Sequence, residues 1–216
     1  MTAVGPGGVT QRSVTISVNA TFGNFAGTWY HNFGTMTLSQ NGADVTGNYF
    51  NGFAGMNGTV HGTVTGNTLN GNWSIGGGTG QIRWVLVPGG NQFTGNWDNS
   101  NLWCGARAGK PVPAGCSFAG TWNTNISCGD PHVNLQRVDM TVTGSYCTDR
   151  TISGSVSYSL EDVVLTGNWL DPGGTTGGFQ FFIPGYGAGL FRGHYSPGSN
   201  QWCGWRTGSQ PSPCFK

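Results

Sequence analysis

Phe25-Ala26-Gly27-Thr28-Trp29 opens a pattern that the chain uses twice, since Phe118-Ala119-Gly120-Thr121-Trp122 opens a second copy. Each copy closes on a similar phrase, Trp103-Cys104-Gly105-Ala106-Arg107 in the first and Trp202-Cys203-Gly204-Trp205-Arg206 in the second. Between these ends, related phrases recur in the same order: Val45-Thr46-Gly47-Asn48-Tyr49 with Val142-Thr143-Gly144-Ser145-Tyr146, and Leu69-Asn70-Gly71-Asn72-Trp73 with Leu165-Thr166-Gly167-Asn168-Trp169. An ordered internal duplication predicts two copies of one structural unit.

Each copy reads as a run of short strands separated by turn residues, with no segment of helical period. In the first copy we expect strands at 26–31, 34–39, 43–50, 58–65, 68–74, 80–87, 92–97 and 102–107. In the second we expect them at 119–124, 133–138, 139–147, 151–158, 162–169, 177–183, 189–195 and 201–206. The fold class is therefore all-β, with two tandem antiparallel meander units of barrel or sandwich type. Whether they close as one barrel or two stays open.

The predicted boundaries are a tail with an additional strand at 1–24, a first repeat at 25–109, a linker at 110–117 and a second repeat at 118–216. Residues 1–11 are glycine-rich without a strand pattern, whereas residues 13–22 alternate polar and apolar side chains as a half-buried strand does. The second copy has no equivalent of this strand. Its apolar side chains are Val14, Ile16, Val18, Ala20 and Phe22.

Composition excludes several classes of function. Gly accounts for 40 of 216 residues and charged residues for only 8%, against about 25% in a typical domain. The 9 Trp, 12 Phe and 6 Tyr indicate a folded chain, because disordered segments lack aromatic residues. A net charge of +1 with no basic stripe argues against nucleic acid. No apolar run approaches the roughly 18 residues of a membrane span.

Six cysteines allow fifteen pairings, which the duplication narrows. Cys104 precedes Cys116 by 12 residues and Cys203 precedes Cys214 by 11, each across a proline-containing tail. We therefore predict the disulfides Cys104–Cys116 and Cys203–Cys214, which leaves Cys128 with Cys147. No Cys-x-x-Cys spacing supports a metal site. Disulfides indicate an extracellular or cell-surface protein, although the sequence leaves open whether a signal peptide was removed.

The recurring glycines within aromatic strands predict that each large ring lies over a glycine of a neighbouring strand, so that most tryptophans form the core. Arg107 and Arg206 occupy the same place in both copies, next to a Trp and a disulfide cysteine. We expect each guanidinium to stack on a ring or to bind carbonyl groups of the tail.

Gly27-Thr28-Trp29-Tyr30, followed by an alternating strand and Thr46-Gly47-Asn48-Tyr49, resembles the opening of the avidin family. The resemblance implies an eight-stranded meander barrel with a ligand in its open mouth. Tyr49 falls where that family has a ligand-binding tyrosine, and His31 where it has a ligand-binding asparagine. The corresponding residues of the second copy are Tyr146 and Thr124. The duplicated pattern also resembles the Gly/Thr/Trp-rich β-repeats of uncharacterised secreted bacterial proteins.

Little in the sequence indicates catalysis, and we predict that the protein is not an enzyme and uses no cofactor. Glycoside hydrolysis needs two carboxylates that face one bond. The only adjacent acids, Glu161 and Asp162, would point to opposite faces of a strand, and we interpret them as solvated turn residues. The histidines lack metal-ligand spacing, and Asp130-Pro131-His132 reads as a loop contact. Asn-x-Ser/Thr sequences permit glycosylation at Asn19, Asn57, Asn72 and Asn125.

Two functional hypotheses remain. The first is an extracellular structural protein, a surface or filament subunit that associates with itself when strand 13–22 adds to a neighbouring sheet edge. The alternative is a β-barrel module that binds carbohydrate or another small ligand, with Trp84, Trp97, Trp103 and Trp205 as stacking platforms.

Overall fold

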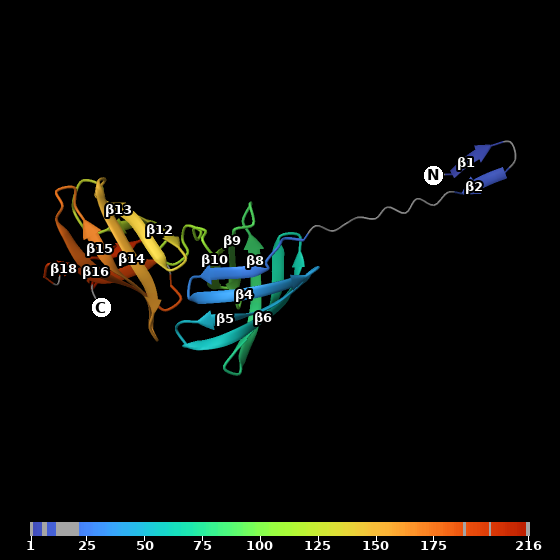
Figure 1. Cartoon of the computed structure of the whole chain (residues 1–216), viewed down its shortest axis with the longest axis horizontal. Helices are drawn as coiled ribbons and strands as arrows, with labels where there is room; N and C mark the ends of the chain where they lie inside the picture. Colours follow the sequence, from blue (N-terminus) through green and yellow to red (C-terminus); the bar gives the residue numbers. More distant parts are fainter. Residues whose placement is uncertain (1, 6–7, 12–21, 188, 199, 215–216) are drawn as a thin grey trace.

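The computed structural model of the chain describes residues 2–5, 8–11, 22–187, 189–198 and 200–214. These residues form an all-β protein, without a helix in the described ranges. Two antiparallel barrels follow one another along the molecule (Figure 1). The repeats therefore close as two separate barrels, which the sequence left undecided.

The first barrel is a simple meander in which each strand pairs with the next along the chain and the last pairs with the first. Its eight strands are β3 (Gly27–His31), β4 (Gly34–Asn41), β5 (Asp44–Asn51), β6 (Met56–Thr65), β7 (Thr68–Ile75), β8 (Gly78–Leu86), β9 (Gln92–Trp97) and β10 (Asn101–Arg107). The β10–β3 pair closes it, with Ala106 opposite Tyr30.

The second barrel repeats this order with a broken final strand. Its strands are β11 (Gly120–Thr124), β12 (His132–Val138), β13 (Thr141–Tyr146), β14 (Arg150–Tyr158), β15 (Asp162–Leu170), β16 (Thr176–Pro184), β17 (Leu190–Tyr195), β18 (Asn200–Gln201) and β19 (Gly204–Trp205). Strand β19 pairs with both β17 and β11, and β16 pairs with β17, so the ring closes.

The amino-terminal segment differs from expectation. Residues 1–11, read as unpatterned, contain the antiparallel pair β1 (Thr2–Gly5) and β2 (Gly8–Gln11). Most of the expected strand 13–22, including Val14, Ile16, Val18 and Ala20, lies outside the described residues. Its last member, Phe22, is 36% exposed.

Inside both barrels, large rings lie over glycines of the neighbouring strand, as the sequence predicts. In the β5–β6 pair Tyr49 stands opposite Gly58, and a Cβ at Gly58 would lie 2.5 Å from the tyrosine ring. In the β15–β16 pair Trp169 stands opposite Gly177 in the same way, at 2.7 Å. Six of the nine tryptophans are buried, and these are Trp29, Trp84, Trp103, Trp122, Trp169 and Trp202.

Each barrel is closed at one end, its base, by an arginine stacked on a tryptophan. The Arg206 guanidinium lies 3.7 Å from the centre of the Trp122 ring and donates hydrogen bonds to the carbonyls of Ser117 and Ala119. Burial lowers the pKa of Arg206 to about 10. Arg107 stacks on Trp29 at 4.4 Å in the first barrel. Both arginines therefore have the structural role that their repetition predicts.

The three disulfides are the predicted pairs, Cys104–Cys116, Cys128–Cys147 and Cys203–Cys214. The first and third join the closing strand region of each barrel to the tail that follows it. The second exists only in the second barrel, where it ties the loop after β11 to the end of β13.

The base of the second barrel packs on the open mouth of the first. Tyr158, at the end of β14, covers Gly52 in the β5–β6 loop, where a Cβ would lie 2.6 Å from the tyrosine Cβ. The fully buried Arg137 donates a hydrogen bond of 3.0 Å to the Tyr158 hydroxyl, which donates in turn to the His31 carbonyl at 3.3 Å. These contacts join the two barrels directly.

We expect Gly52→Ala to loosen this contact, because the added methyl group would overlap Tyr158. Overpacking of this kind costs roughly 1–3 kcal/mol, measurable as a lower free energy of unfolding and as a longer molecule in small-angle scattering. Gly173→Ala is the matched control, since a Cβ there meets no atom within 4 Å. In a Tyr158→Gly background, which removes both the ring and the Cβ that the new methyl group would meet, Gly52→Ala should have little effect. An undiminished loss there would contradict the assignment.

Candidate functional site

Both barrels have an open end, the mouth, lined by the same set of rings. The equivalent pairs are Tyr49 and Tyr146, Trp73 and Trp169, Trp97 and Tyr195, and Trp103 and Trp202. Each ring comes from the mouth end of its strand, and so the meander gathers residues that are far apart in sequence. Aromatic walls with a few polar groups are typical of small-ligand sites.

The mouth of the second barrel contains a cavity of about 220 Å³. Trp169, Tyr195, Trp202 and Ile126 supply its apolar wall. Its polar wall is an ion pair, because Arg150 Nε lies 3.1 Å from Asp171 Oδ1. The side chains of this pair are 35% and 26% exposed, which leaves both within reach of a ligand.

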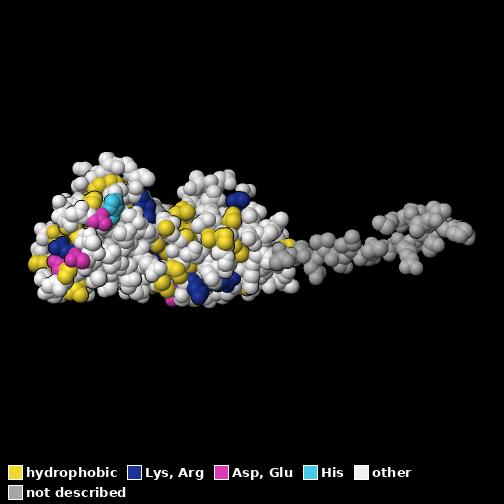
Figure 2. All heavy atoms as spheres, turned by 90° about the horizontal axis from the view of Figure 1, so that it is seen from above, with side chains coloured by type: hydrophobic (Ala, Val, Ile, Leu, Met, Phe, Trp, Pro, Cys, Tyr) yellow, Lys and Arg dark blue, Asp and Glu magenta, His cyan; other side chains and the backbone are white. Residues whose placement is uncertain are grey.

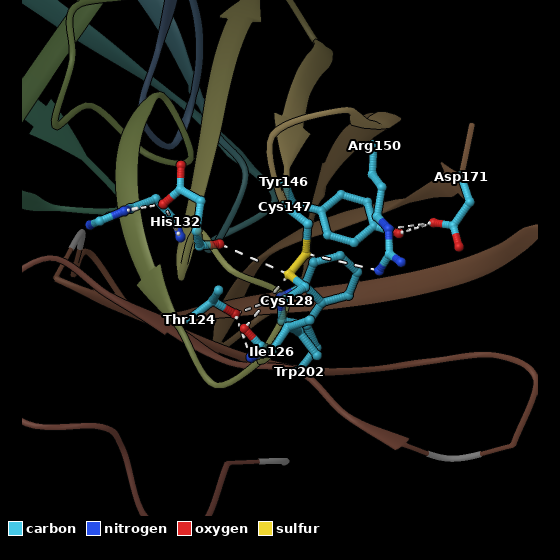
Figure 3. Close-up of a disulfide and its surroundings, with 10 residues drawn as sticks. Thr124, Ile126, Cys128, His132, Tyr146, Cys147, Arg150, Asp171 and Trp202 are labelled. Atoms are coloured by element: carbon cyan, nitrogen blue, oxygen red, sulfur yellow. Dashed lines mark hydrogen bonds and ion pairs between the residues drawn. A yellow bond between two sulfur atoms is a disulfide. The ribbon is translucent and has the colours of Figure 1, made fainter. Parts of the chain in front are cut away.

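Tyr146 links the polar wall to the rings. Its hydroxyl donates a 3.1 Å hydrogen bond to Asp171 Oδ1, and the Arg150 guanidinium lies 5.7 Å from its ring centre. Figure 3 shows Tyr146, Arg150 and Asp171 in this arrangement. Burial, followed by the bond to Asp171, raises the pKa of Tyr146, so this hydroxyl stays protonated at neutral pH.

The floor of this cavity is fixed by hydrogen bonding and by the disulfide. Trp202 Nε1 donates a 2.8 Å hydrogen bond to Thr124 Oγ1, which also accepts the Ile126 amide at 3.3 Å. The Cys128–Cys147 disulfide lies beside these residues (Figure 3). A floor held in this way is preorganised, which reduces the entropy lost when a ligand binds.

The mouth of the first barrel is smaller and differs in chemistry. Its cavity measures about 60 Å³ because Tyr186, from the β16–β17 loop at the base of the second barrel, lies across it. Ile75 stands at the position that Asp171 has in the second repeat, so none of the described residues that line this cavity carries a carboxylate. Burial, with a smaller contribution from Tyr186, raises the pKa of Tyr49 to about 12.

The loop that covers the first mouth differs between the two repeats. Pro184-Gly185-Tyr186 at the base of the second barrel corresponds to Pro88-Gly89-Gly90 at the base of the first. The tyrosine that enters the first mouth is therefore particular to the second repeat.

The predicted stacking platform does not exist as one surface. Trp84 and Trp103 are 0% and 1% exposed, and their rings pack against each other inside the first barrel. Trp97 lines the first mouth with Trp103, whereas Trp205 lies in β19 of the other barrel. Of the four residues, Trp97 and Trp103 therefore line the first mouth, Trp84 is buried beneath it in the same barrel, and Trp205 belongs to the other barrel.

The two positions implied by the avidin resemblance have different surroundings. Tyr49 and Tyr146 line the two cavities. His31 is fully buried beneath Phe33 and Trp103, and Thr124 is engaged with Trp202. Sequence reasoning missed Arg150, Asp171 and Tyr186, since each lacks a counterpart in the first repeat and pattern matching looks for what is shared.

The other chemical candidates remain apart from these cavities. His132 Nδ1 lies 2.5 Å from Asp130 Oδ1, the loop contact expected for that pair. Asp162 is only 3% exposed, so its interpretation as a solvated turn residue is wrong, whereas Glu161 is exposed. Among the described residues, no three His, Cys, Asp or Glu side chains gather as metal ligands.

The possible glycosylation sites differ in access. Asn57 and Asn72 are both exposed, while Asn19 lies outside the described residues. Asn125 uses both ends of its amide, because Nδ2 donates to the Gln201 carbonyl and Oδ1 accepts the Cys203 amide. Of the described sites, Asn57 and Asn72 are therefore more accessible to modification than Asn125.

The outer surface over β7 to β9 has a polar hollow of about 410 Å³. It is lined mainly by amide and guanidinium side chains, which are Asn70, Asn72, Gln81, Arg83, Asn96 and Asn99. It contains no aromatic ring, unlike the two mouths. Figure 2 shows how few charged side chains the described surface carries on the face in view.

Comparison with known protein families, curated proteins and solved structures found no match to this chain. In addition, no helix in the described part of the chain has the length and hydrophobicity needed to cross a membrane. The arrangement of the two mouths is therefore the basis for any proposal about function.

Burial makes His31 a source of acid sensitivity. Desolvation lowers its pKa from 6.5 to about 3, the hydrogen bond with the Thr35 backbone opposes this, and the charge of Arg137 lowers it further. Because the unfolded chain binds this proton more readily, we expect stability to be lost as pH falls from about 6.5 towards 3. The loss should reach about 1.4 kcal/mol per pH unit.

Urea unfolding at several pH values measures this slope. His31→Thr, which copies the second barrel, should flatten it, whereas the exposed His61→Thr serves as the matched control and should not. An unchanged slope in His31→Thr would show that other groups cause the acid sensitivity.

Proposed function

We propose that this protein is an extracellular binding protein that holds a carbohydrate ring in the mouth of its second barrel. Three disulfides support a non-reducing, extracellular setting. The observation that carries the proposal is an open, preorganised aromatic mouth in which a carboxylate and a guanidinium are held side by side.

A sugar ring needs two kinds of contact, and this mouth offers both. Its C–H faces pack on aromatic rings, here Trp169 and Tyr195, which stand edge to face with centres 6.5 Å apart. The hydroxyl groups of the sugar can pair with one group that donates hydrogen bonds, here Arg150, and with one that accepts them, here Asp171. A cavity of about 220 Å³ is below the roughly 300–1,000 Å³ of drug-sized pockets, which favours a single ring.

Binding fits this mouth better than hydrolysis does. Asp171 is the one carboxylate among the described residues that line the cavity, and it already accepts hydrogen bonds from Tyr146 and Arg150. Glycosidases place two carboxyl groups on either side of the scissile bond. We therefore propose recognition without chemistry on the ligand.

Titration with a panel of mono- and disaccharides, followed by calorimetry or tryptophan fluorescence, tests the proposal. For any sugar that binds, Asp171→Asn and Tyr195→Ala should each weaken binding by about tenfold or more, because a charge-assisted hydrogen bond or an aromatic contact is worth roughly 1–3 kcal/mol. Trp97→Ala, the equivalent of Tyr195→Ala in the first barrel, is the matched control and should leave sugar affinity unchanged. Absence of binding across the panel, or equal losses in the control, would count against the proposal.

Self-association is a second proposal, supported only by the alternating pattern of residues 13–22. If this segment adds to the sheet of another copy, deletion of residues 1–22 should convert an oligomer to a monomer. Size-exclusion chromatography with light scattering measures this. An identical mass before and after the deletion would eliminate the proposal.

A further inference from the structure

We propose that the mouth of the first barrel is a second ligand site, for a small phenolic compound, which Tyr186 occupies in the free protein and which the ligand enters by displacing Tyr186. This site is separate from the proposed carbohydrate site in position and in chemistry. The protein would then carry two different ligands in two equivalent mouths.

Tyr186 is held in the mouth as a bound ligand would be. Its ring lies edge to face against Phe53 at 4.7 Å, Trp97 at 5.2 Å and Phe33 at 5.3 Å between centres. Its hydroxyl accepts a 3.2 Å hydrogen bond from Asn51 Nδ2. Three rings around a phenol and one amide at its hydroxyl form a recognition site for a 4-hydroxyphenyl group.

Space and hydrogen-bond donors remain beneath Tyr186. The cavity of about 60 Å³ is lined by Trp97 and Trp103, and the indole nitrogens of both are buried without a hydrogen-bond partner among the described atoms. Trp202, the equivalent of Trp103, does have a partner in Thr124. Buried donors without partners are costly, and a ligand that carries an acceptor would satisfy them where Tyr186 does not.

Tyr186 can leave without separating the barrels. It is 37% exposed and lies between Gly185, whose φ is +56°, and Gly187. The remaining contact between the barrels is carried by Tyr158 on Gly52 and by Arg137 on the Tyr158 hydroxyl. Because glycines flank Tyr186 on both sides, this residue can turn outward while the contact persists.

The chemistry of the wall favours a phenol over a sugar. Where the second mouth has Asp171, the first has Ile75, and where the second has Arg150, the first has Gly58, which the Tyr49 ring covers. The first mouth therefore offers rings and one amide but no charged pair. A planar aromatic ligand with a single hydroxyl matches that set.

Because Tyr186 competes from within the chain, the apparent affinity for a phenol is reduced by the fraction of molecules in which the mouth is open. Removal of the competing ring should raise that affinity. The free counterpart of the tyrosine side chain is p-cresol, which makes it the natural probe.

The experiment titrates p-cresol into the full chain and into Tyr186→Ala, followed by calorimetry and by protein NMR. Tyr186→Ala should bind one equivalent, at least about tenfold more tightly than the unchanged protein. Tyr186→Phe keeps the ring in place and should remain close to the unchanged protein. Near-ultraviolet circular dichroism checks that each variant is folded.

Further variants in the Tyr186→Ala background locate the bound probe. Trp97→Ala and Asn51→Ala should weaken p-cresol binding, and replacing p-cresol with toluene should remove the effect of Asn51→Ala. Tyr195→Ala, in the second mouth, is the matched control and should change nothing. The proposal is overturned if folded Tyr186→Ala does not bind p-cresol, if it binds no more tightly than the unchanged protein, or if Tyr195→Ala abolishes binding. Sugar titrations use the other mouth, so failure of one proposal leaves the other intact.

Discussion

The packing of aromatic rings onto glycines of the adjacent strand is the constraint on which the rest of this structure depends. In several cross-strand pairs the ring stands directly opposite the glycine, among them Tyr49–Gly58, Trp73–Gly80, Phe93–Gly105, Trp169–Gly177, Phe181–Gly193 and Phe191–Gly204. A Cβ at any of these glycines would overlap the ring. Glycine weakens a strand on its own, but the ring that covers it restores burial and fixes the register. A chain with only 8% charged residues can in this way build two barrel interiors from rings packed together with aliphatic side chains.

The same packing determines where polar groups can lie. At the base of each barrel the half-buried arginine is accommodated because its guanidinium stacks on a tryptophan and donates to carbonyls. At the mouths the rings reach the ends of the strands, and a few polar side chains, Asn51 in one barrel and Arg150 with Asp171 in the other, complete the walls. The two repeats thus have equivalent mouths lined by aromatic rings, and differences at a few positions around each mouth give the two sites different chemistry.

The two mouths are unequal because the base of the second barrel packs on the mouth of the first. The base of the second barrel contributes Tyr158 and Tyr186 to the first mouth. Tyr158 ends β14 and Tyr186 lies in the β16–β17 loop, at the same end of that barrel. The base of the first barrel has Gly90 in the loop where the second has Tyr186. Because the base of the second barrel packs on the first mouth, that mouth is filled from within the molecule, whereas no described residue of the first barrel lines the second. The proposals of a carbohydrate site and of a self-occupied phenolic site both follow from this asymmetry, together with the extracellular setting that three disulfides favour.

The sequence by itself determined the local order of the protein. Period-two patterns, turn residues and the duplication place all sixteen expected strands close to strands of the structure, although the last of them is broken, and equal spacings identify the disulfide pairs and the stacked arginines. These features depend on neighbours in the chain or on comparison of the two copies. Only the tertiary structure decided that the repeats close as two barrels, that Trp84 and Trp103 are core, and that Tyr186 meets Asn51 across 135 residues. Closure and docking depend on strand register and on contacts between distant loops, and no local pattern of residues encodes those.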